Sequence, residues 1–336
     1  MDPSQLLSWP PVSVIMPVLD EEQHLAEAVA GVLAQDYPGE LELVLSLGPS
    51  QDRTDEIAAG LATADDRIRL VENPSGRTPD ALNAAIKAAR HDLIVRADGH
   101  GVLSPGYIRV AVDEIKRTGA ANVGGIMRAE GETDFEHAVA RAMTSALGIG
   151  AAPFHLGGSP GPADSVYLGV FRREVLDRLG GYDEHFARAQ DWELNHRIRA
   201  AGETVWFTPD LVVTYRPRSS LRNLAGQFFR TGQWRREVIR RYPGTASPRY
   251  LAAPVVTAAV GAGAVAGLLG VLGGPRWLAF GWLAPAGYAV GAVVAGATEG
   301  RDLPLRARAW LPPVLATMHL SWGAGFIAGT ARRRPG

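Results

Sequence analysis

The sequence predicts an α/β fold, with a mostly parallel sheet covered by helices on both faces, followed by C-terminal transmembrane helices. Short β-branched runs alternate with helical apolar spacing over the first hundred residues, and three long runs without charge follow residue 249. The charge also divides the chain. Residues 251–336 contain seven arginines and two acids, whereas residues 1–250 hold 27 basic and 33 acidic side chains. We therefore expect two parts with different surroundings.

The α/β part is expected to contain four strands before residue 100. The strands span 12–17, 41–47, 68–71 and 93–95, and helices are expected at 21–33, from residue 54, and at 81–89. Such alternation favours a parallel sheet, whose ligands bind beyond the carboxyl ends of the strands. Polar clusters follow three of these strands: Asp20–Glu22, Ser50–Asp52 and Arg96–His100. We expect these clusters to converge on one cleft.

The C-terminal part is expected to cross a membrane. Residues 250–275, 277–298 and 309–331 carry no charge, and each run is long enough to span a hydrocarbon core of about 30 Å. The expected spans are about 252–273, 277–298 and 309–330. Tryptophans lie at or near the segment ends, where an indole favours the interface: Trp277, Trp282 and Trp310. The alternative is a buried helical hairpin in a soluble protein.

The charge pattern predicts a cytoplasmic catalytic domain on a multi-pass protein of the cell membrane. The first residues have no basic stretch and no long apolar run, so no signal peptide is expected there. Eight arginines lie between residues 216 and 241, with Glu237 as the only acid among them. Basic residues next to a span favour the inner side. Three spans would place Arg332–Arg334 outside, against this rule. Either the tail is tolerated there or one segment is re-entrant; we favour three spans.

The composition excludes several classes of protein. The chain has no cysteine, which excludes disulfide scaffolds, thiol nucleophiles and cysteine-ligated metal sites. High apolar content and glycines without a fixed period exclude disordered and collagen-like chains. Arginine outnumbers lysine 32 to 2, which is typical of a GC-rich bacterial genome. We expect membrane lipids, and no nucleic acid, among the partners.

Five short motifs follow one another between residues 14 and 197. They are Pro17-Val18-Leu19-Asp20-Glu21, Ser50-Gln51-Asp52-Arg53-Thr54, Gly76-Arg77 before Ala81-Leu82-Asn83, Arg96-Ala97-Asp98, and the run from Gln190-Asp191 to Arg197. In this order they resemble the family 2 glycosyltransferases, which have the GT-A fold. The stretches 98–100, 164–167, 215–221 and 319–323 further resemble the succinoglycan-type glucosyltransferase branch.

The resemblance implies a nucleotide-sugar donor and a divalent cation, Mg²⁺ or Mn²⁺. Such a cation neutralises the leaving diphosphate and prefers oxygen ligands. Asp98 is the expected metal ligand, and Arg96 replaces the first acid of the family's Asp-x-Asp motif. His100 is a candidate second ligand, which would favour Mn²⁺. The alternative is that Asp98 and His100 only shape the turn after the strand.

The resemblance also makes Asp191 the candidate general base, at or near the start of a helix. A base that takes the proton of the acceptor hydroxyl during attack on the anomeric carbon gives inversion in one step. Glu193 points to another helix face and is expected to play a supporting part. The alternative role for Asp191 is that of a helix N-cap.

Nucleotide-sugar contacts are expected along the strand ends. The candidates that the resemblance implies are Pro17, Asp20, Glu21, Asp52, Arg77, Asn83, Ala97 and Asp98. Arg77 is the candidate partner of the diphosphate. Leu47 and Gly48 stand where the family has an Asp pair that contacts uracil, so the donor base stays open. The alternative for Asp52 is an Asx-turn to its own backbone.

A basic segment before the first span resembles the Gln-x-x-Arg-Trp signature of membrane-bound members. Its candidates for the diphosphate or the acceptor, together with Gln190, are Gln227, Arg230 and Trp234. The alternative is an interfacial helix whose Leu224, Phe228 and Phe229 enter the membrane while arginines meet anionic lipid. His319, in the third expected span, either touches a lipid phosphate or bonds a neighbouring helix, and we favour the helix.

These observations predict three regions and one leading function. The regions are a catalytic domain (1–215), a basic amphipathic interfacial segment (216–249) and a transmembrane domain (250–336). The leading function is an inverting transfer of a sugar from a nucleotide donor, expected to be a UDP-sugar, to a lipid-linked polyprenyl-diphosphate saccharide in polysaccharide or glycolipid biosynthesis. The alternatives are a polyprenyl-phosphate sugar synthase, which needs no general base, and an inactive membrane scaffold.

Overall fold

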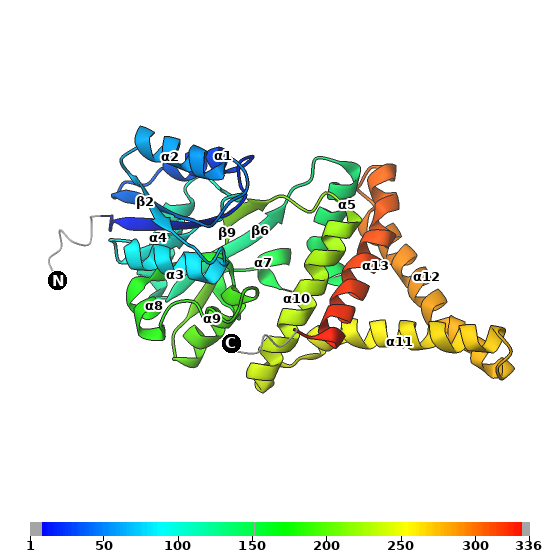
Figure 1. The fold of residues 1–336 in the computed structure, drawn as a ribbon. Helices are drawn as coiled ribbons and strands as arrows, with labels where there is room; N and C mark the ends of the chain where they lie inside the picture. The colour runs from blue at the N-terminus through cyan, green and yellow to red at the C-terminus, as the bar shows by residue number, and fades with distance from the viewer. Residues whose placement is uncertain (1–8, 151, 331–336) are drawn as a thin grey trace. The chain divides into compact units, whose positions relative to one another are not determined.

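The computed structural model describes residues 9–150 and 152–330, which divide into two compact units (Figure 1). The first unit holds the sheet, in the order β3-β2-β1-β4-β8-β6-β9-β5, with β7 paired to β9. The parallel strands are β1 (Val12–Val18), β2 (Leu41–Leu47), β3 (Ile68–Glu72) and β4 (Leu93–Arg96). The predicted strands before residue 100 are therefore confirmed.

The other half of the sheet is antiparallel, so the sheet is mixed. Its strands are β5 (Val102–Leu103), β6 (Asn122–Ala129), β7 (Gly161–Pro162), β8 (Tyr167–Arg172) and β9 (Val205–Tyr215). β8 pairs antiparallel with both β4 and β6, which places it in the middle of the sheet. The expected GT-A-type α/β fold holds, but its parallel part ends at β4.

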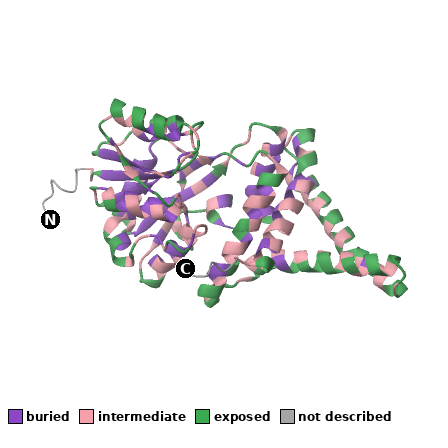
Figure 2. Ribbon diagram, in the orientation of Figure 1, coloured by how far each residue is buried: buried purple, intermediate pink, exposed green. Residues whose placement is uncertain are grey.

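Helices cover both faces of the sheet, as predicted. One face packs on α1 (Leu25–Leu33), α2 (Thr54–Ala64) and α4 (Tyr107–Thr118), and the other on α3 (Thr78–Ala88), α8 (Arg173–Leu179) and α9 (Gln190–Ala200). Within β1, Val14 and Met16 join the first core, whereas Ile15 joins the second. This alternation is the period-two pattern of a strand buried on both faces. Figure 2 shows the resulting buried layers.

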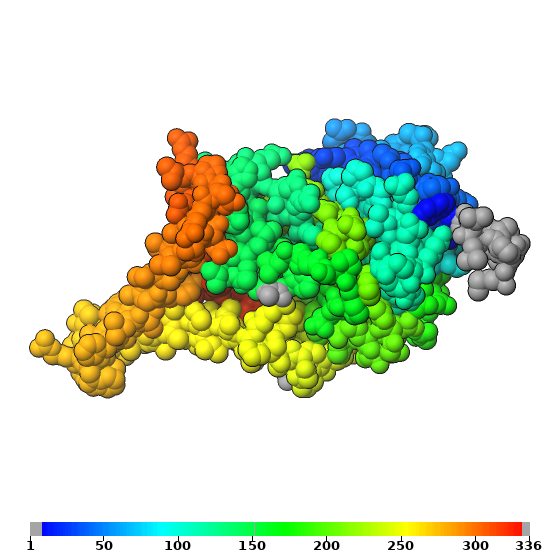
Figure 3. All heavy atoms as spheres, turned by 180° about the vertical axis from the view of Figure 1, so that it is seen from behind, coloured from blue at the N-terminus to red at the C-terminus, as the bar shows by residue number. Residues whose placement is uncertain are grey.

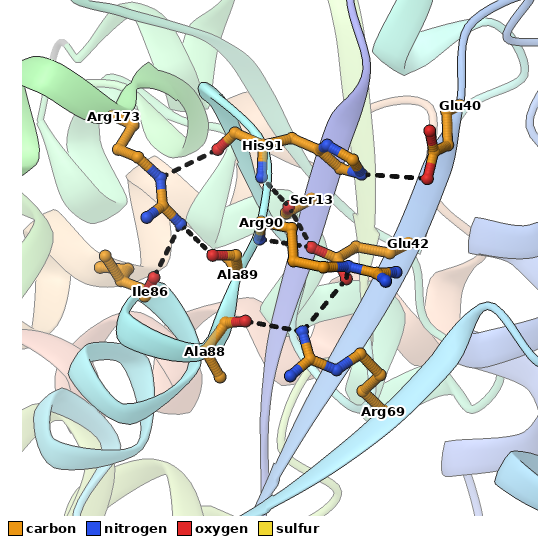
Figure 4. A network of polar contacts seen from close by, with 10 residues as sticks. All are labelled: Ser13, Glu40, Glu42, Arg69, Ile86, Ala88, Ala89, Arg90, His91 and Arg173. Atoms are coloured by element: carbon orange, nitrogen blue, oxygen red, sulfur yellow. Dashed lines mark hydrogen bonds and ion pairs between the residues drawn. The ribbon is translucent and has the colours of Figure 1, made fainter.

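A buried carboxylate ties together the amino ends of the parallel strands (Figure 4). Glu42, whose side chain is 1% exposed, accepts hydrogen bonds through Oε1 from Ser13 Oγ (2.6 Å) and the Arg90 backbone N–H (2.6 Å). Its Oε2 accepts from Arg90 Nε (2.8 Å) and Arg69 Nη1 (3.4 Å). Nearby, Arg173 donates to carbonyls at the end of α3. Both oxygens of Glu42 are therefore satisfied by the protein.

The second unit comprises the described parts of residues 129–152 and 217–336. Its helices are α5 (Asp134–Met143), α6 (Ala146–Ile149), α10 (Leu221–Arg241), α11 (Pro248–Val271), α12 (Leu283–Glu299) and α13 (Leu305–Ala328), with 3₁₀ turns η2 (Pro243–Thr245) and η3 (Arg276–Trp282). The segment 129–152 thus groups with the C-terminal helices, although the sequence suggested a continuous catalytic domain to residue 215. The short α7 (Pro153–Leu156) belongs to the first unit.

Two helical segments of this unit are long and apolar enough to cross a membrane. They are Pro248–Val271, with a mean hydropathy of 1.9, and Arg276–Glu299, with 1.6. Their most apolar windows are 11% and 0% buried within the chain, which argues against the alternative of a buried hairpin in a soluble protein. The two segments, yellow to orange in Figure 3, pack on each other at η3 and diverge from there. At their contact, Gly263 faces the Gly281 carbonyl and Gly267 the Trp282 ring so closely that a Cβ would not fit.

The third expected span, α13, is as long as these two segments at 24 residues, but it is not among the helices apolar enough to cross a membrane. It carries Arg306 and Arg308 in its first turn and Pro312 and Pro313 in its interior. Buried residues of α13 pack on protein: α13 contacts α5 and α10, and Phe135 of α5 lies edge-on to Trp310 at 5.4 Å. A third crossing is therefore not supported. The tail Arg332–Arg334 lies outside the described residues.

Candidate active site

The polar clusters after β1, β2 and β4 come together at one edge of the sheet, as the parallel order requires. The β1 and β2 loops bond reciprocally: Asp20 N–H donates to Ser50 Oγ (3.2 Å), and Gln51 N–H donates to Asp20 Oδ1 (2.7 Å). The β4 loop joins through His100, whose Nδ1 lies 2.7 Å from Glu21 Oε1. Asp20 has a left-handed backbone (φ 54°), which a short polar side chain tolerates better than most.

Asp52 forms the Asx-turn that was the alternative to nucleotide binding. Its Oδ1 accepts from the Thr54 N–H (3.0 Å), and its Oδ2 accepts from the Glu22 N–H (3.2 Å). The hydrogen bond from the Thr54 hydroxyl is the main cause of the lowered pKa of Asp52. Asp52 thus stays ionised and ties the two loops together. Contact with a nucleotide remains a prediction for this residue.

Arg96, at the end of β4, joins the candidate metal ligand to the candidate base. Its side chain is 4% exposed and forms ion pairs with both Asp98 and Asp191. Nε and Nη2 lie 3.3 and 3.2 Å from Asp98 Oδ1, and Nη1 contacts Asp191 Oδ1. The Tyr182 ring lies 5.7 Å from the guanidinium carbon. The sequence marks Arg96 only as a missing acid, whereas the structure makes it the centre of the cluster.

Asp191 is the second residue of α9, so it is not the N-cap. The cap is Ala189, which turns the chain into the helix with a left-handed backbone (φ 62°) and offers no side-chain bond. In the first turn the carboxylate of Asp191 meets the positive end of the helix dipole. Burial raises the pKa of Asp191, the Arg96 guanidinium lowers it, and the charge of Asp98 raises it again, with a net rise. A carboxylate with a raised pKa is a better proton acceptor.

Glu193 lies two residues after Asp191 in α9 and so points to a different face of the helix, as expected. Its buried carboxylate pairs with Arg197 (2.7 Å), which also donates to the carbonyls of Leu179 and Gly181, both at 2.8 Å. The next residue, Tyr182, exchanges two hydrogen bonds of 2.8 Å with the Asn83 side chain. Arg77 bonds the Glu184 carbonyl in the same loop. Asn83 and Arg77 therefore brace the loop that carries Tyr182, a part that their motif alone did not suggest.

Two remaining strand-end candidates and one helix-start candidate complete this part of the site. Pro17 is the penultimate residue of β1, and Ala97 is fully buried, with its N–H donating to the Ile15 carbonyl (3.0 Å). Gln190 is the first residue of α9 and is half-buried.

A divalent cation would have one carboxylate of the first unit as its protein ligand. Within the described ranges no group of three or more His, Asp or Glu side chains is arranged to hold a metal ion, and His100 is engaged by Glu21. Asp98 keeps its Oδ2 clear of Arg96. One carboxylate fits the way Mg²⁺ binds with substrate phosphates, where one or two protein carboxylates suffice. The donor set therefore fits a cation that arrives with a diphosphate.

The candidates of the second unit lie on α10, whose apolar side is already covered. Leu224 and Phe228 are 0% and 7% exposed, and α10 approaches α13 so closely that a Cβ on Gly232 would meet the Trp322 carbonyl. These two side chains do not enter lipid, contrary to the interfacial alternative. Arg230 is exposed on α10, Gln227 accepts from Arg218 Nε (3.1 Å), and Trp234 is half-buried.

His319 bonds neighbouring helices, the favoured interpretation. Its Nε2 lies 2.7 Å from the Leu147 carbonyl of α6, and its Nδ1 lies 3.0 Å from the Tyr288 hydroxyl of α12. A carbonyl only accepts, so Nε2 carries the proton and Tyr288 donates to Nδ1. The imidazole therefore links α6, α12 and α13.

Comparisons with known proteins agree with this fold. Residues 13–180 match the family model described as glycosyl transferase family 2. The chain is 30% identical over 319 residues to the succinoglycan biosynthesis protein ExoA of Rhizobium meliloti, covering 93% of each. It is 23% identical to a dolichyl N-acetyl-alpha-D-glucosaminyl phosphate 3-beta-D-2,3-diacetamido-2,3-dideoxy-beta-D-glucuronosyltransferase of Methanococcus voltae, covering 68% of this chain and 74% of that protein.

A solved structure shares the architecture. The mannosyltransferase PcManGT of Pyrobaculum calidifontis, in complex with GDP-Man and Mn²⁺, superposes with a TM-score of 0.58 at 22% identity. The likeness covers 93% of this chain and 86% of that one.

Proposed function

This chain belongs to glycosyl transferase family 2, and from that premise we propose that it transfers a sugar, with inversion, from a nucleotide-sugar donor to a lipid-linked acceptor at the cytoplasmic membrane face. The observation that carries the proposal is the Arg96–Asp98–Asp191 cluster at the carboxyl ends of the strands. The product belongs to polysaccharide or glycolipid biosynthesis, as the succinoglycan relative suggests. A UDP-sugar is the proposed donor, and a polyprenyl-diphosphate saccharide the proposed acceptor.

The reaction needs one proton acceptor and one site for the leaving group. Asp191 takes the proton of the acceptor hydroxyl while the oxygen attacks the anomeric carbon from the side opposite the donor diphosphate. The bond between the anomeric carbon and the diphosphate oxygen breaks, and its electron pair leaves with the nucleoside diphosphate. When bound beside Asp98, Mg²⁺ or Mn²⁺ would supply charge neutralisation to that leaving group. Arg230 is the proposed contact for a lipid diphosphate, since a guanidinium suits bidentate phosphate binding.

We further propose that α11 and the η3–α12 segment cross the membrane as one hairpin. An even number of crossings leaves the basic segment 216–249, Arg301–Arg308 and the tail Arg332–Arg334 on one side, in accord with the positive-inside rule. The chain has no cysteine, so single cysteines can be labelled without background. A membrane-impermeant maleimide should label Arg276→Cys from outside intact cells, and Arg301→Cys and Thr330→Cys only after permeabilisation. Outside labelling of Thr330→Cys would instead mean a third crossing.

A nucleotide-release assay on membranes tests the transfer. UDP-, GDP- and dTDP-sugars would be supplied with lipid extract and Mg²⁺ or Mn²⁺, and we expect metal-dependent release from one donor. Asp98→Asn should abolish the response to metal. Asp65→Asn is the matched control, because Asp65 also pairs with an arginine two residues away, Arg67, at 2.7 Å on the surface. Absence of turnover and of nucleotide binding would support the inactive scaffold instead.

A further inference from the structure

Arg96 divides its hydrogen bonds between two carboxylates that the proposed reaction uses for different purposes. Its Nε and Nη2 both point at Asp98 Oδ1, and its Nη1 at Asp191 Oδ1. A guanidinium is planar and always charged, so its fork fixes the direction of each partner. The two aspartates lie far apart in sequence, on β4's end and in α9, and Arg96 is the side chain that joins them.

The second oxygen of each carboxylate is left without a protein donor. Among the residues that the structure describes, none donates a hydrogen bond to Asp98 Oδ2 or to Asp191 Oδ2. Both side chains also keep a path to solvent, with 17% of Asp98 and 25% of Asp191 exposed. Arg96 therefore fixes one oxygen of each carboxylate, and the other oxygen of each can meet water or a bound substrate.

We propose that Arg96 is a positioning residue that holds Asp98 and Asp191 by one oxygen each and so presents the other oxygen of each to the substrates. Asp98 Oδ2 faces the donor diphosphate and its cation, and Asp191 Oδ2 faces the acceptor hydroxyl. The inference rests on the proposed sugar transfer and adds to it a residue that couples the two halves of the site.

A purely stabilising ion pair has a different arrangement in the same domain. Arg90 and Arg69 surround one carboxylate, Glu42, and both of its oxygens are satisfied together with Ser13. In the Arg96 cluster one cation serves two acids, and half of the carboxylate oxygens stay open. The Tyr182 ring also holds the Arg96 side chain in place, since it lies 5.7 Å from the guanidinium carbon. Arg96 is thus a rigid, buried cation that fixes the orientation of Asp98 and Asp191.

The test compares Arg96 variants with a matched arginine in the full-length protein in membranes. For Arg96→Gln we expect kcat to fall about 100-fold, the loss expected when a reacting group is misplaced by about 1 Å, and the KM for the donor to rise, because Asp98 is no longer held toward the donor diphosphate. Arg96→Lys should recover part of the loss, because it restores the charge without the fork. Guanidinium ions added to Arg96→Ala should restore turnover. Arg90→Gln, the control, should leave kcat unchanged and show no guanidinium response.

A double variant separates positioning from general loss of structure. In the Asp191→Asn background, Arg96→Gln should lower kcat by less than it does alone, because the base that it positions is already gone. Its effect on the donor KM, which acts through Asp98, should remain. Wild-type kcat in Arg96→Gln would overturn the inference while leaving the proposed transfer intact. The inference would also be overturned if the kcat of the double variant fell by the product of the two single losses. A loss of kcat that neither guanidinium ions nor Arg96→Lys relieves would overturn it as well. An inactive wild type would instead overturn the proposed function.

Discussion

Two arginine–carboxylate clusters lie at opposite ends of the parallel strands, and their difference separates structure from chemistry. At the amino ends, Glu42 is 1% exposed and has every oxygen bonded to the protein. At the carboxyl ends, Asp191 is 25% exposed and shares Arg96 with Asp98. The Glu42 cluster has more donors than acceptor oxygens, so no oxygen is left for a ligand. The Arg96 cluster has two carboxylates for one arginine, so oxygens remain available to a ligand.

The pKa of Glu42 is lowered and that of Asp191 is raised, because the two acids have different numbers of hydrogen-bond donors. Burial raises the pKa of Glu42, but hydrogen bonds from Ser13 and Arg90 outweigh it and the pKa is lowered. Burial also raises the pKa of Asp191, and there the single Arg96, shared with Asp98, does not reverse the rise. An acid held firmly ionised supports the fold, whereas an acid that accepts a proton more readily suits catalysis.

The largest expected effect is on turnover at the carboxyl ends. Asp191→Asn removes the proton acceptor, so kcat should fall about 1,000-fold, within the range for loss of a general base. The asparagine keeps an acceptor oxygen for Arg96, which also keeps its ion pair with Asp98. The raised pKa of Asp191 means that folding does not favour its charge, so the free energy of unfolding should change by less than about 1 kcal/mol. Initial rates of nucleotide release and thermal unfolding in detergent check both. Turnover that survives would indicate a phosphate acceptor, as in a polyprenyl-phosphate sugar synthase.

An intermediate effect is expected on stability at the amino ends. Glu42→Gln puts an amide donor against the arginines and should lower the free energy of unfolding by about 2 kcal/mol, the scale of a lost charged hydrogen bond. Denaturant unfolding followed by tryptophan fluorescence measures this loss. At temperatures where the variant is folded, its kcat should match wild type. A large fall in kcat would erase the distinction between the clusters.

The smallest expected effect is on the free energy of unfolding at acidic pH. The folded pKa of Glu42 lies below its ordinary value of 4.5, so its contribution is fully present above that value and is lost as the pH falls through the folded pKa. The stability difference between wild type and Glu42→Gln should therefore be constant near pH 7 and shrink below pH 4.5. Unfolding midpoints measured across this range would show it. A difference that does not change with pH would mean that Glu42 titrates normally.

Local sequence predicted the parallel half of the first unit well. The runs at β1, β2 and β4 are short, apolar and followed by polar residues, so both the strands and the shared edge followed from the order of the chain. The antiparallel half was missed because β8 pairs with β4 across more than 70 residues, with Leu168 and Gly169 in left-handed conformations. No local pattern encodes such a pairing.

In the candidate site, too, the sequence predicted the individual residues but not the contacts between them. Asp98 and Asp191 came from motifs, but their link through Arg96 joins residues 95 apart and depends on tertiary packing. The grouping of 129–152 with the C-terminal helices likewise depends on particular contacts, such as His319 with the Leu147 carbonyl. The apolar side of α10 suggested lipid, yet Leu224 and Phe228 are buried in the protein. Amphipathic spacing predicts a buried face without naming what covers it.

The most direct test measures turnover and unfolding together in wild type, Asp191→Asn, Glu42→Gln and the double variant. The two sites share no partner, so their effects should be independent. We predict that the double variant combines the catalytic loss of Asp191→Asn with the stability loss of Glu42→Gln, and that neither single variant shows the other's defect. Normal turnover in Asp191→Asn, or equal loss of turnover in both single variants, would contradict the assignment of chemistry to the carboxyl ends of the strands.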